Sequence, residues 1–336
     1  MMVKRKKDKL MITVVILDFL VFLGFFFTYG PISFFRNLLI TSAMTTRTHQ
    51  YLAYIFYNED TISKVMKENV VNNFDEATDT TAIKFNNDIT DPGTYANEFE
   101  EQVLKRDEGN DLYKVFTTKY KKNTIHVLVV YDPSRISMVL STRNARGGQM
   151  MTTIAKQNNA IAAVNASGYS RNRSTGALIP VGVVISGGKI TAGTTTTNQL
   201  IGFNEDNVLV LTYDDAETAI KNGMRDAMSF GPFLIMNGEK AEMKGDGGWG
   251  YAPRTAIAQR KDGIVLFAVS DGRGKGSPGL SMVQLADFLY QYGAYNAANL
   301  DGGGSSVMVV KDKLVNDPGG YTYTGERYLC NAWILK

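Results

Sequence analysis

The sequence predicts an α+β fold in which one sheet-dominated domain follows a transmembrane helix and a helical stalk. Three observations lead to this prediction. An apolar run of 20 residues lies near the N-terminus, and short β-rich runs separated by Gly, Asn and Asp turns fill the chain from about residue 112. One amphipathic helix then connects two of those runs. With 336 residues, the chain is long enough for such an arrangement.

The basic residues gather at the N-terminus. Residues 1–9 carry five Lys and Arg side chains against one Asp, whereas the whole chain has 36 Lys and Arg against 33 Asp and Glu. The chain beyond this flank is therefore close to neutral. We expect no nucleic-acid partner, because a general nucleic-acid-binding surface needs a basic patch on the folded domain.

Cysteine and histidine are rare. Cys330 is the only cysteine, so neither an intrachain disulfide nor a cysteine-based zinc site can form. His49 and His126 are the only histidines, and we expect both to be polar residues without a catalytic role. Any chemistry should therefore depend on carboxylates, Arg, Asn and backbone amides.

The apolar run, residues 10–29, predicts a membrane span. At about 1.5 Å per residue it reaches roughly 30 Å, the thickness of a bilayer core. The basic flank before it predicts a single-pass cell-membrane protein with a cytoplasmic N-terminus and an outer domain. A cleaved signal peptide is the competing interpretation, although no small-residue cleavage site follows promptly. Asp18 within the span either pairs with a partner helix or is a tolerated charge.

Two segments link the span to the outer domain. Residues 30–70 show pairs of apolar residues at helical spacing, which predicts a helical stalk. We expect this stripe to pack against its own chain, although it could also bind a partner or the membrane surface. Residues 71–111 are acidic and weakly patterned, with 11 Asp and Glu against three Lys and Arg from residue 72, which predicts a spacer.

The outer domain, residues 112–336, should be built mainly from strands. The β-rich runs are Ile125–Tyr131, Arg135–Leu140, Ala160–Asn165, Val181–Ile185, Ala256–Gln259, Ile264–Ser270, Ala297–Leu300 and Val307–Val310. A helix is predicted to begin at Ser281 with a capping box completed by Gln284, and Gly293 is placed to end it. It forms a strand–helix–strand crossover, which normally makes the two strands parallel.

Two carboxylates should meet at one edge of the sheet. Asp271 follows the strand before the crossover helix, and Asp301 follows the strand after it. Because parallel strands end at the same edge, both are candidates for acid, base or nucleophile roles. The competing interpretation is that an Asp before Gly only shapes a turn.

Three glycines and two serines follow Asp301. Gly302, Gly303 and Gly304 let a backbone approach a ligand closely and could aim successive amides at an anion, while Ser305 and Ser306 add hydroxyl donors.

A hairpin brings a cation to the same edge. If Asp262-Gly263 forms a two-residue turn, Arg254 lies opposite Asp271, where its guanidinium could contact a phosphate. Another turn would shift this register by one, and a surface Arg–Asp pair is the alternative. Asn165 ends another strand and could supply an amide to the site, although Asn165-Ala166-Ser167 is also a glycosylation sequon.

Several motifs, in order, resemble the phosphodiester glycosidase family. They are Val164-Asn165-Ala166-Ser167-Gly168-Tyr169, Ser229-Phe230-Gly231-Pro232, Ala252-Pro253-Arg254-Thr255-Ala256, Ser270-Asp271-Gly272-Arg273, Tyr295 to Ser306, Gly325-Glu326-Arg327 and Asn331-Ala332. The resemblance covers about residues 112–336. The membrane segment and stalk are similar to those of anchored members from Gram-positive bacteria.

The resemblance implies hydrolysis of a sugar from a sugar-1-phosphodiester, with a sugar-phosphate glycopolymer of the cell wall or exopolysaccharide as the substrate. Asp301 would be base or nucleophile, with Asp271 as its partner or as the residue that orients Arg254. Arg254 and residues 302–306 would bind phosphate. Asn165, Gly168, Arg273 and Arg327 would line the substrate site.

Two other functions fit the same residues. One is a membrane-tethered module that binds a phosphate-containing polymer without turnover, and the other is a phosphodiesterase that cuts the P–O bond. We expect no cofactor. A divalent cation between Asp271 and Asp301 is left open, because two carboxylates alone do not establish a metal site. The oligomeric state stays open.

Overall fold

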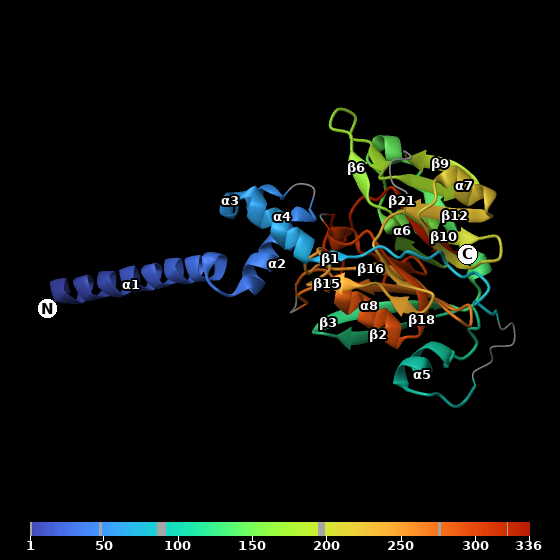
Figure 1. Ribbon diagram of the computed structural model, residues 1–336, viewed down its shortest axis with the longest axis horizontal. Coiled ribbons are helices and arrows are strands. Elements are labelled where there is room, and N and C mark those ends of the chain that lie inside the picture. The colour runs from blue at the N-terminus through green and yellow to red at the C-terminus, as the bar shows by residue number, and fades with distance from the viewer. Residues whose placement is uncertain (1, 47–48, 86–91, 194–198, 275–276, 321) are drawn as a thin grey trace. The chain divides into compact units, whose positions relative to one another are not determined.

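A computed structural model describes residues 2–46, 49–85, 92–193, 199–274, 277–320 and 322–336. The chain forms two compact units. One comprises Met1–Val70 and Lys244–Gly250, and the other comprises Val71–Met243 and Tyr251–Lys336. Helices make up most of the first unit, and strands dominate the second (Figure 1).

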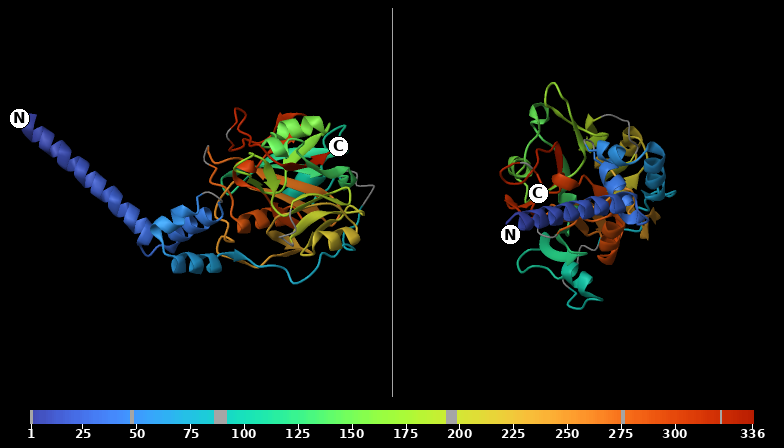
Figure 2. Two further views of the ribbon diagram at one scale, coloured as in Figure 1. Left: turned by 90° about the horizontal axis from the view of Figure 1, so that it is seen from above. Right: turned by 90° about the vertical axis from the view of Figure 1, so that its left-hand side faces the viewer.

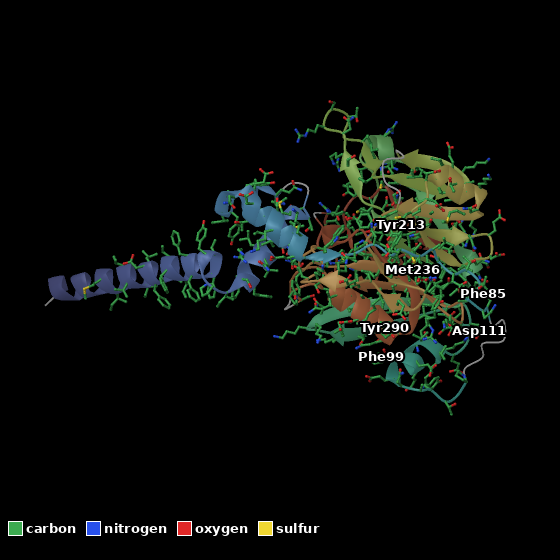
Figure 3. All side chains as sticks on the ribbon, viewed as in Figure 1. Phe85, Phe99, Asp111, Tyr213, Met236 and Tyr290 are labelled. Carbon is green, nitrogen blue, oxygen red and sulfur yellow. The ribbon has the colours of Figure 1, made fainter. Side chains whose placement is uncertain are left out.

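The first unit begins with α1 (Met2–Tyr29), an uninterrupted rod in both views of Figure 2. Its segment Met11–Tyr29 has a mean hydropathy of 2.4, and none of it is buried. Figure 3 shows side chains projecting on both sides of the segment 11–29 of this helix. The helix therefore has the length and composition of a membrane span, as the sequence predicts.

Three short helices follow, and they share a small core. They are α2 (Ser33–Met44), α3 (Tyr51–Phe56) and α4 (Glu59–Glu68). Asn58 caps α4, because its side chain accepts a hydrogen bond of 2.9 Å from the amide of Thr61. The core consists of Ile40, Ala43, Ala53, Tyr57, Ile62 and Val65.

Three of the four apolar pairs of the stalk, at residues 34–35, 51–52 and 55–56, have exposed members. The fourth pair, Leu38-Leu39, is half-buried, and Leu39 packs against the core. The expectation that the stripe packs against its own chain is therefore met by Leu39, whereas most of the other three pairs is left exposed. Other faces of α2 and α3, which carry Ile40 and Ala53, fill the core.

The segment Lys244–Gly250 joins the first unit from far along the sequence. Asp246 fixes it there: its carboxylate accepts a hydrogen bond of 2.7 Å from the Thr41 hydroxyl. The Asp246 amide donates to the Asn69 side chain at 3.1 Å. Nothing in the local sequence predicts this insertion.

In the described residues of the second unit, the strands form three larger sheets and one small one, and neighbouring strands in them pair antiparallel. The seven-stranded sheet has the order β14 (Glu239–Lys240), β13 (Phe233–Met236), β18 (Ala294–Leu300), β16 (Thr255–Arg260), β17 (Val265–Ser270), β3 (Asn123–Val130) and β2 (Tyr113–Tyr120). The first five-stranded sheet has the order β11 (Leu209–Thr212), β10 (Leu200–Asn204), β12 (Met224–Ser229), β8 (Val183–Ser186) and β9 (Lys189–Gly193). The second has the order β20 (Lys313–Leu314), β19 (Met308–Val310), β5 (Ala162–Asn165), β21 (Asn331–Leu335) and β4 (Ile136–Leu140).

Shorter elements complete the chain. The hairpin of β6 (Tyr169–Arg171) and β7 (Leu178–Pro180) forms the small sheet, and β1 (Val70–Val71) pairs with β15 (Met243–Lys244). The remaining helices are α5 (Glu98–Leu104), α6 (Met151–Gln157), α7 (Ala216–Lys221) and α8 (Met282–Gln291), with the 3-10 turns η1 (Pro133–Arg135), η2 (Asn144–Arg146) and η3 (Gly303–Ser305).

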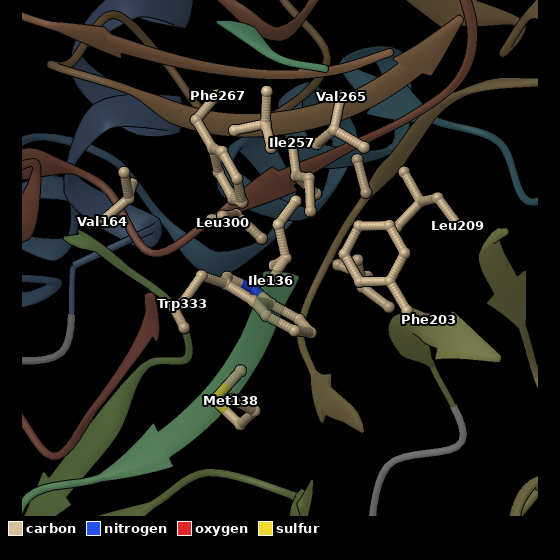
Figure 4. Close-up of a cluster of buried hydrophobic side chains, with 14 of the residues drawn as sticks. Ile136, Met138, Val164, Phe203, Leu209, Ile257, Val265, Phe267, Leu300 and Trp333 are labelled. Atoms are coloured by element: carbon tan, nitrogen blue, oxygen red, sulfur yellow. The ribbon is translucent and has the colours of Figure 1, made fainter. Parts of the chain in front are cut away.

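One hydrophobic core joins the three larger sheets (Figure 4). Phe267 comes from the seven-stranded sheet, and Phe203 and Trp333 come from the two five-stranded sheets. The rings of Phe203 and Trp333 meet edge to face with centroids 5.6 Å apart. The predicted sheet-dominated α+β class is confirmed.

The predicted crossover is also present. The α8 capping box forms, because the Gln284 amide donates to the Ser281 hydroxyl at 3.2 Å and the Gln284 side chain accepts from the Ser281 amide at 3.3 Å. The strands β17 and β18 are parallel to each other, since both are antiparallel to β16, which lies between them. Their C-terminal ends therefore lie on one edge of the sheet.

The predicted register of the β16–β17 hairpin is wrong by one residue. Thr255 pairs with Val269, so Arg254 lies opposite Ser270 rather than Asp271. The loop has three residues instead of two. The amide of Gly263, at φ +87°, donates to the carbonyl of Arg260, and the amide of Arg260 donates to the carbonyl of Ile264. A turn followed by a left-handed glycine is the usual geometry of a three-residue hairpin loop.

The segment predicted as an acidic spacer is more ordered than its composition suggests. It contains α5, and parts of it run along the domain. The Thr78 hydroxyl donates to the carbonyl of Leu211 at 2.8 Å and accepts from its amide at 2.9 Å. The Phe74 amide donates to the hydroxyl of Tyr213, which Figure 3 labels, at 3.0 Å. Residues 86–91 of the spacer lie outside the described residues.

Tyr292 gives the domain a predictable sensitivity to alkali. Burial raises the pKa of its phenol to about 12. Between pH about 10, where the unfolded phenol ionises, and about 12, the folded state holds the extra proton, so the free energy of unfolding falls as pH rises. In Tyr292→Phe, urea unfolding followed across this range should show a shallower fall. Equal slopes for the two proteins would contradict the prediction, and Tyr290→Phe, at an exposed position, is the control.

Candidate active site

Three strand ends meet at the edge predicted to hold the site. Asp271 follows β17, Asp301 follows β18, and Arg254 precedes β16, which runs the opposite way. The Arg254 amide donates to the Ser270 hydroxyl at 2.8 Å, and the Ser270 amide donates to the Arg254 carbonyl at 2.9 Å. Since Thr255 pairs with Leu300, the next position in this register sets Arg254 beside Asp301. The structure therefore brings Arg254 to the β18 carboxylate rather than to the β17 carboxylate.

Arg254 is buried and lies under the glycine turn. Its Nε donates to the carbonyl of Leu280 at 2.9 Å. A Cβ built on Gly302 would lie 2.8 Å from the carbonyl oxygen of Pro253 and 3.8 Å from Cδ of Arg254. Only glycine permits the turn to approach the Pro253 carbonyl so closely, while the distance to Arg254 is an ordinary van der Waals contact.

The glycine turn differs from the predicted anion cradle. The amides of Gly303, Ser305 and Ser306 donate to the carbonyls of Pro253, Gly302 and Gly303 respectively. These amides therefore close the turn instead of facing a ligand. Both serines are buried, and the Ser306 hydroxyl has no partner among the described residues. The Ser305 hydroxyl accepts from Arg327 Nη1 at 3.5 Å.

Asn165 holds the glycine turn in place through hydrogen bonds of its side chain. Its Nδ2 donates to the carbonyl of Asp301 at 2.5 Å. Its Oδ1 accepts hydrogen bonds from the Thr255 hydroxyl at 2.8 Å and from the Val307 amide at 3.0 Å. Asn165 is only 1% exposed. It is thus a positioning residue that joins both ends of the glycine turn to β16, and the predicted substrate contact by its amide is not what this geometry offers.

Asn165→Ala should destabilise the second unit. The substitution leaves the Val307 amide, the Thr255 hydroxyl and the Asp301 carbonyl without this partner. Each buried polar group left unpaired costs about 1–3 kcal/mol, so we expect the loss of three partners to lower the free energy of unfolding by about 3 kcal/mol or more. Urea unfolding followed by tryptophan fluorescence measures this change. Asn222→Ala, at an exposed position, is the control, and an equally small effect in both variants would contradict the prediction.

A second group of side chains surrounds Asp301. A Cβ built on Gly168 would lie 3.9 Å from Oδ1 of Asp301 and 3.0 Å from the Phe230 ring, so Gly168 allows the close approach of these segments. Tyr169 follows directly. Burial raises the pKa of its phenol, while the nearby Arg327 guanidinium lowers that pKa in part and the Asp301 carboxylate raises it. The phenol is therefore neutral at physiological pH and able to donate a hydrogen bond.

Arg327 reaches this group from the C-terminal segment. A Cβ on Gly304 would lie 3.1 Å from Cδ of Arg327, so the guanidinium arm lies against the glycine turn. The neighbouring Glu326 is fully buried, and its carboxylate accepts from the Thr152 amide and hydroxyl, each at 3.0 Å. These bonds fix the chain beside Arg327 at the start of α6.

Asp271 has a different environment. Its Oδ1 accepts hydrogen bonds from Nε2 of His126 at 3.0 Å and from the Asp317 amide at 2.8 Å. The other ring nitrogen of His126 lies 2.9 Å from the Thr117 hydroxyl. Both ring nitrogens of His126 are therefore engaged, one by the Asp271 carboxylate and the other by the Thr117 hydroxyl. His126 is thus an orienting partner of a candidate site residue, a role that its strand sequence alone does not reveal.

The segment Asp317–Gly319 connects the two turns. The Gly272 amide donates to the Asp317 carbonyl at 2.7 Å. A Cβ on Gly272 would lie 2.8 Å from the Gly319 amide nitrogen, and a Cβ on Gly304 would lie 3.1 Å from the Gly319 carbonyl oxygen. We call Asp317–Gly319 the strap, because it lies between the Asp271 turn and the glycine turn. Asp271 holds the strap through the Asp317 amide, and His126 orients Asp271.

A pocket of about 290 Å³ opens beside the Asp271 turn. The charged side chains of its lining are Lys119, Lys122, Arg273, Asp271 and Asp317, so the cations exceed the carboxylates by one. The rest of the lining is Thr124, Gly272, Gly274, Ser277, Pro318 and Gly319. Because the pocket has one more cation than carboxylates, it can bind an anionic group.

Residues 158–336 match the sequence model of the phosphodiester glycosidase family. The chain belongs to this family. All of the site residues predicted from the sequence, from Asn165 to Arg327, lie within this stretch. His126, Lys119 and Lys122 precede it.

Among relatives of the chain, the mouse N-acetylglucosamine-1-phosphodiester alpha-N-acetylglucosaminidase is 27% identical over 214 residues, which is 57% of this chain and 41% of that protein. The SPbeta prophage-derived uncharacterized protein YomE of Bacillus subtilis (strain 168) is 29% identical over 215 residues, which is 60% of this chain and 32% of that protein. The chain therefore spans less than half the length of these two relatives.

A solved structure supports the fold of the phosphodiester glycosidase domain. It is the zebrafish N-acetylglucosamine-1-phosphodiester alpha-N-acetylglucosaminidase catalytic domain, auto-inhibited by its pro-peptide. It matches with a TM-score of 0.56 at 20% identity, over 68% of this chain and 85% of that chain. At this identity the likeness bears on the fold alone.

Within the described part of the chain, no three His, Cys, Asp or Glu side chains gather into a group that could hold a metal ion. Oδ1 of Asp271 already accepts hydrogen bonds from His126 and from the Asp317 amide.

Proposed function

We propose that the chain hydrolyses the bond between a sugar and phosphate in a sugar-1-phosphodiester. One observation carries the proposal. The phosphodiester glycosidase match over residues 158–336 contains the Asp301 turn together with Arg254, Tyr169 and Arg327, the groups that surround it. The names of the vertebrate relatives specify N-acetylglucosamine-1-phosphodiesters, and a substrate of this class suits the side chains present here.

The reaction needs little acid catalysis. Water adds to the anomeric carbon, the bond from that carbon to the phosphate oxygen breaks, and the phosphomonoester leaves with the electron pair. Its second pKa is near 6, so it is a good leaving group without prior protonation. The site must instead stabilise the phosphate and the positively charged, oxocarbenium-like sugar, and it must activate water.

The roles follow from position. Asp301 acts as base or nucleophile at the end of β18, held in place through its carbonyl by Asn165. Arg254 and Arg327 approach the glycine turn from opposite ends and supply positive charge for the phosphate. The neutral Tyr169 phenol, near Asp301 and Arg327, is placed to donate to an oxygen of the substrate.

Asp271 has a supporting role in this proposal. Because its Oδ1 accepts from His126 and from the Asp317 amide, it orients the strap Asp317–Gly319. This differs from the sequence-based role of Asp271 as the orienter of Arg254, since the register places Arg254 one residue away.

The pocket extends the proposal to a polymer. Lys119, Lys122 and Arg273 line it beside the Asp271 turn, where they can bind a further phosphate of a repeating sugar-phosphate chain. A glycopolymer of the cell wall or exopolysaccharide has this chemistry.

Product analysis tests the reaction. The full chain in detergent is incubated with a sugar-1-phosphodiester, and the products are identified by mass spectrometry. Free sugar and a phosphomonoester in equal amounts support the proposal. Sugar-1-phosphate would instead mean P–O cleavage, and bound but unchanged substrate would mean a binding module. Either of these two results would overturn the proposal.

The location of the domain is part of the proposal. The basic flank before the apolar segment of α1 predicts a cytoplasmic N-terminus, so the second unit would lie outside the cell membrane. Protease added to intact spheroplasts should then release the second unit from the membrane fraction. Full protection of the chain would show the opposite orientation.

A further inference from the structure

The first unit exposes an apolar surface that its own core does not use. Its members are Phe34, Phe35, Tyr51, Tyr54, Ile55 and Phe56, which we call the α2–α3 surface. All six residues of α3 are apolar or aromatic, yet only Ala53 is buried, and the side chains of Tyr54 and Ile55 are 52% and 61% exposed. Six large exposed apolar side chains on two neighbouring helices are more than a soluble surface usually carries, and such exposure usually marks a site of contact with a protein or a membrane.

This surface is attached to the end of the membrane span. The Tyr57 hydroxyl, directly after α3, donates to the carbonyl of Thr28 at 2.9 Å. The rings of Tyr29 and Tyr57 lie with centroids 6.0 Å apart, and those of Phe27 and Phe35 are 4.6 Å apart. The apolar segment of α1 ends at Tyr29. The α2–α3 surface therefore lies at the level where the chain leaves the bilayer core.

The composition of the first unit suits the membrane–water interface. Tyrosine and other aromatic rings with one apolar side and one polar tip are enriched at membrane–water interfaces. The charged residues of the following helix are segregated from this surface: α4 carries Glu59, Asp60, Lys64, Lys67 and Glu68, all exposed. An apolar helix beside a charged one is the arrangement expected of an element that lies in the interface plane.

We propose that the α2–α3 surface is inserted into the boundary between headgroups and acyl chains of the leaflet from which α1 emerges. The stalk is then a membrane-bound base, not a free spacer. A second copy of the chain is a less suitable occupant, because the contacts of α1 with Phe35 and Tyr57 already place this surface at the lipid. The inference depends on α1 spanning the membrane, and incorporation of the chain into lipid nanodiscs tests that condition separately.

A depth measurement tests the inference. The full chain with Ile55→Cys carries an environment-sensitive nitrobenzoxadiazole probe in nanodiscs that hold one copy each and contain phosphatidylcholine and phosphatidylglycerol. Cys330 is buried and should remain unlabelled, which is checked with the unsubstituted chain. The control is Lys64→Cys on α4, where the native side chain is 74% exposed.

At position 55, the probe emission should be blue-shifted relative to position 64, and it should be quenched by lipids with a doxyl group high on the acyl chain. The probe at position 64 should be quenched by iodide in solution. Iodide quenching at position 55 would overturn the inference. A blue shift at position 55 without doxyl quenching would also overturn it. With one copy per disc, that result would mean that another part of the same chain, and not lipid, covers the probe.

A second substitution protects the test against misfolding at position 55. Benzoylphenylalanine in place of Tyr54 retains a large aromatic side chain and forms covalent adducts with its neighbours on illumination. Lipid adducts recovered by mass spectrometry support the inference, whereas adducts to protein alone contradict it. The same photoreactive residue in place of Glu68 should give no lipid adduct.

Discussion

Replacing Asp301 with Asn should lower kcat/KM toward a sugar-1-phosphodiester by about 10³-fold, because a base or nucleophile that loses its charge typically costs 10²–10⁴-fold in rate. The amide keeps the size of the carboxylate. The backbone of Asp301 also keeps its bonds to Asn165 and to the Ala166 carbonyl. The fold should therefore survive, and the loss should appear in kcat more than in KM.

Initial rates with the wild-type and variant chains in the same detergent measure this loss, and thermal unfolding checks the fold. The matched control is Asp312→Asn, an exposed carboxylate in the β19–β20 turn, which should retain full activity. Azide supplied as an external nucleophile should restore part of the turnover of the Asp301→Asn variant. A variant with kcat/KM within about tenfold of the wild-type value would remove Asp301 from the chemistry.

Arg254→Lys should lower kcat/KM by about 10²-fold on the phosphodiester, the typical cost of removing one preorganised group that stabilises developing charge. The lysine keeps the positive charge but loses the planar fork of donors that matches phosphate. It also loses the Nε donor that bonds to the Leu280 carbonyl under the glycine turn.

A substrate without phosphate separates this role from a structural one. On an aryl glycoside of the same sugar, Arg254→Lys should reduce the rate much less than on the phosphodiester, since no phosphate charge develops there. Equal losses on both substrates would mean that Arg254 only supports the turn. Arg135→Lys, at an exposed position, is the control for the chemistry of the substitution.

Much of the fold was predictable from local patterns. The eight β-rich runs in residues 125–310 correspond to β3, β4, β5, β8, β16, β17, β18 and β19. Strands such as β2 (Tyr113–Tyr120) are not predicted by the sequence, because apolar and polar residues alternate only weakly in them. The crossover and its capping box were found because each depends on a few adjacent residues.

The site was predicted in its location but not in its contacts. Asp301, Arg254 and Gly302 do meet at one edge, because strand direction follows from the crossover. The partner of Arg254 was wrong because a three-residue loop replaced a two-residue turn, and one residue of slip changes every pairing in a hairpin. A turn signal containing a single glycine does not distinguish the two loops.

The other differences between the predicted and the observed site arise from the directions in which side chains point. Asn165 stands at a strand end as expected, but its amide points to the Asp301 carbonyl and the Val307 amide rather than to a ligand. His126 becomes a partner of Asp271 because β3 lies beside β17, where His126 pairs with Val269. The strand sequence around His126 shows only that it lies in a strand.

By itself, the sequence determined the long apolar N-terminal helix, the sheet-dominated class, the crossover that brings two aspartates to one edge, and the motifs of the family. These depend on hydrophobic period, chain direction and short glycine patterns, which are local. Only the tertiary structure decided the hairpin register, the pairing of His126 with Asp271, the strap between the two turns, and the exposed α2–α3 surface. Each of these depends on contacts between residues far apart in the chain, whose free energies arise only when the strands and helices pack together.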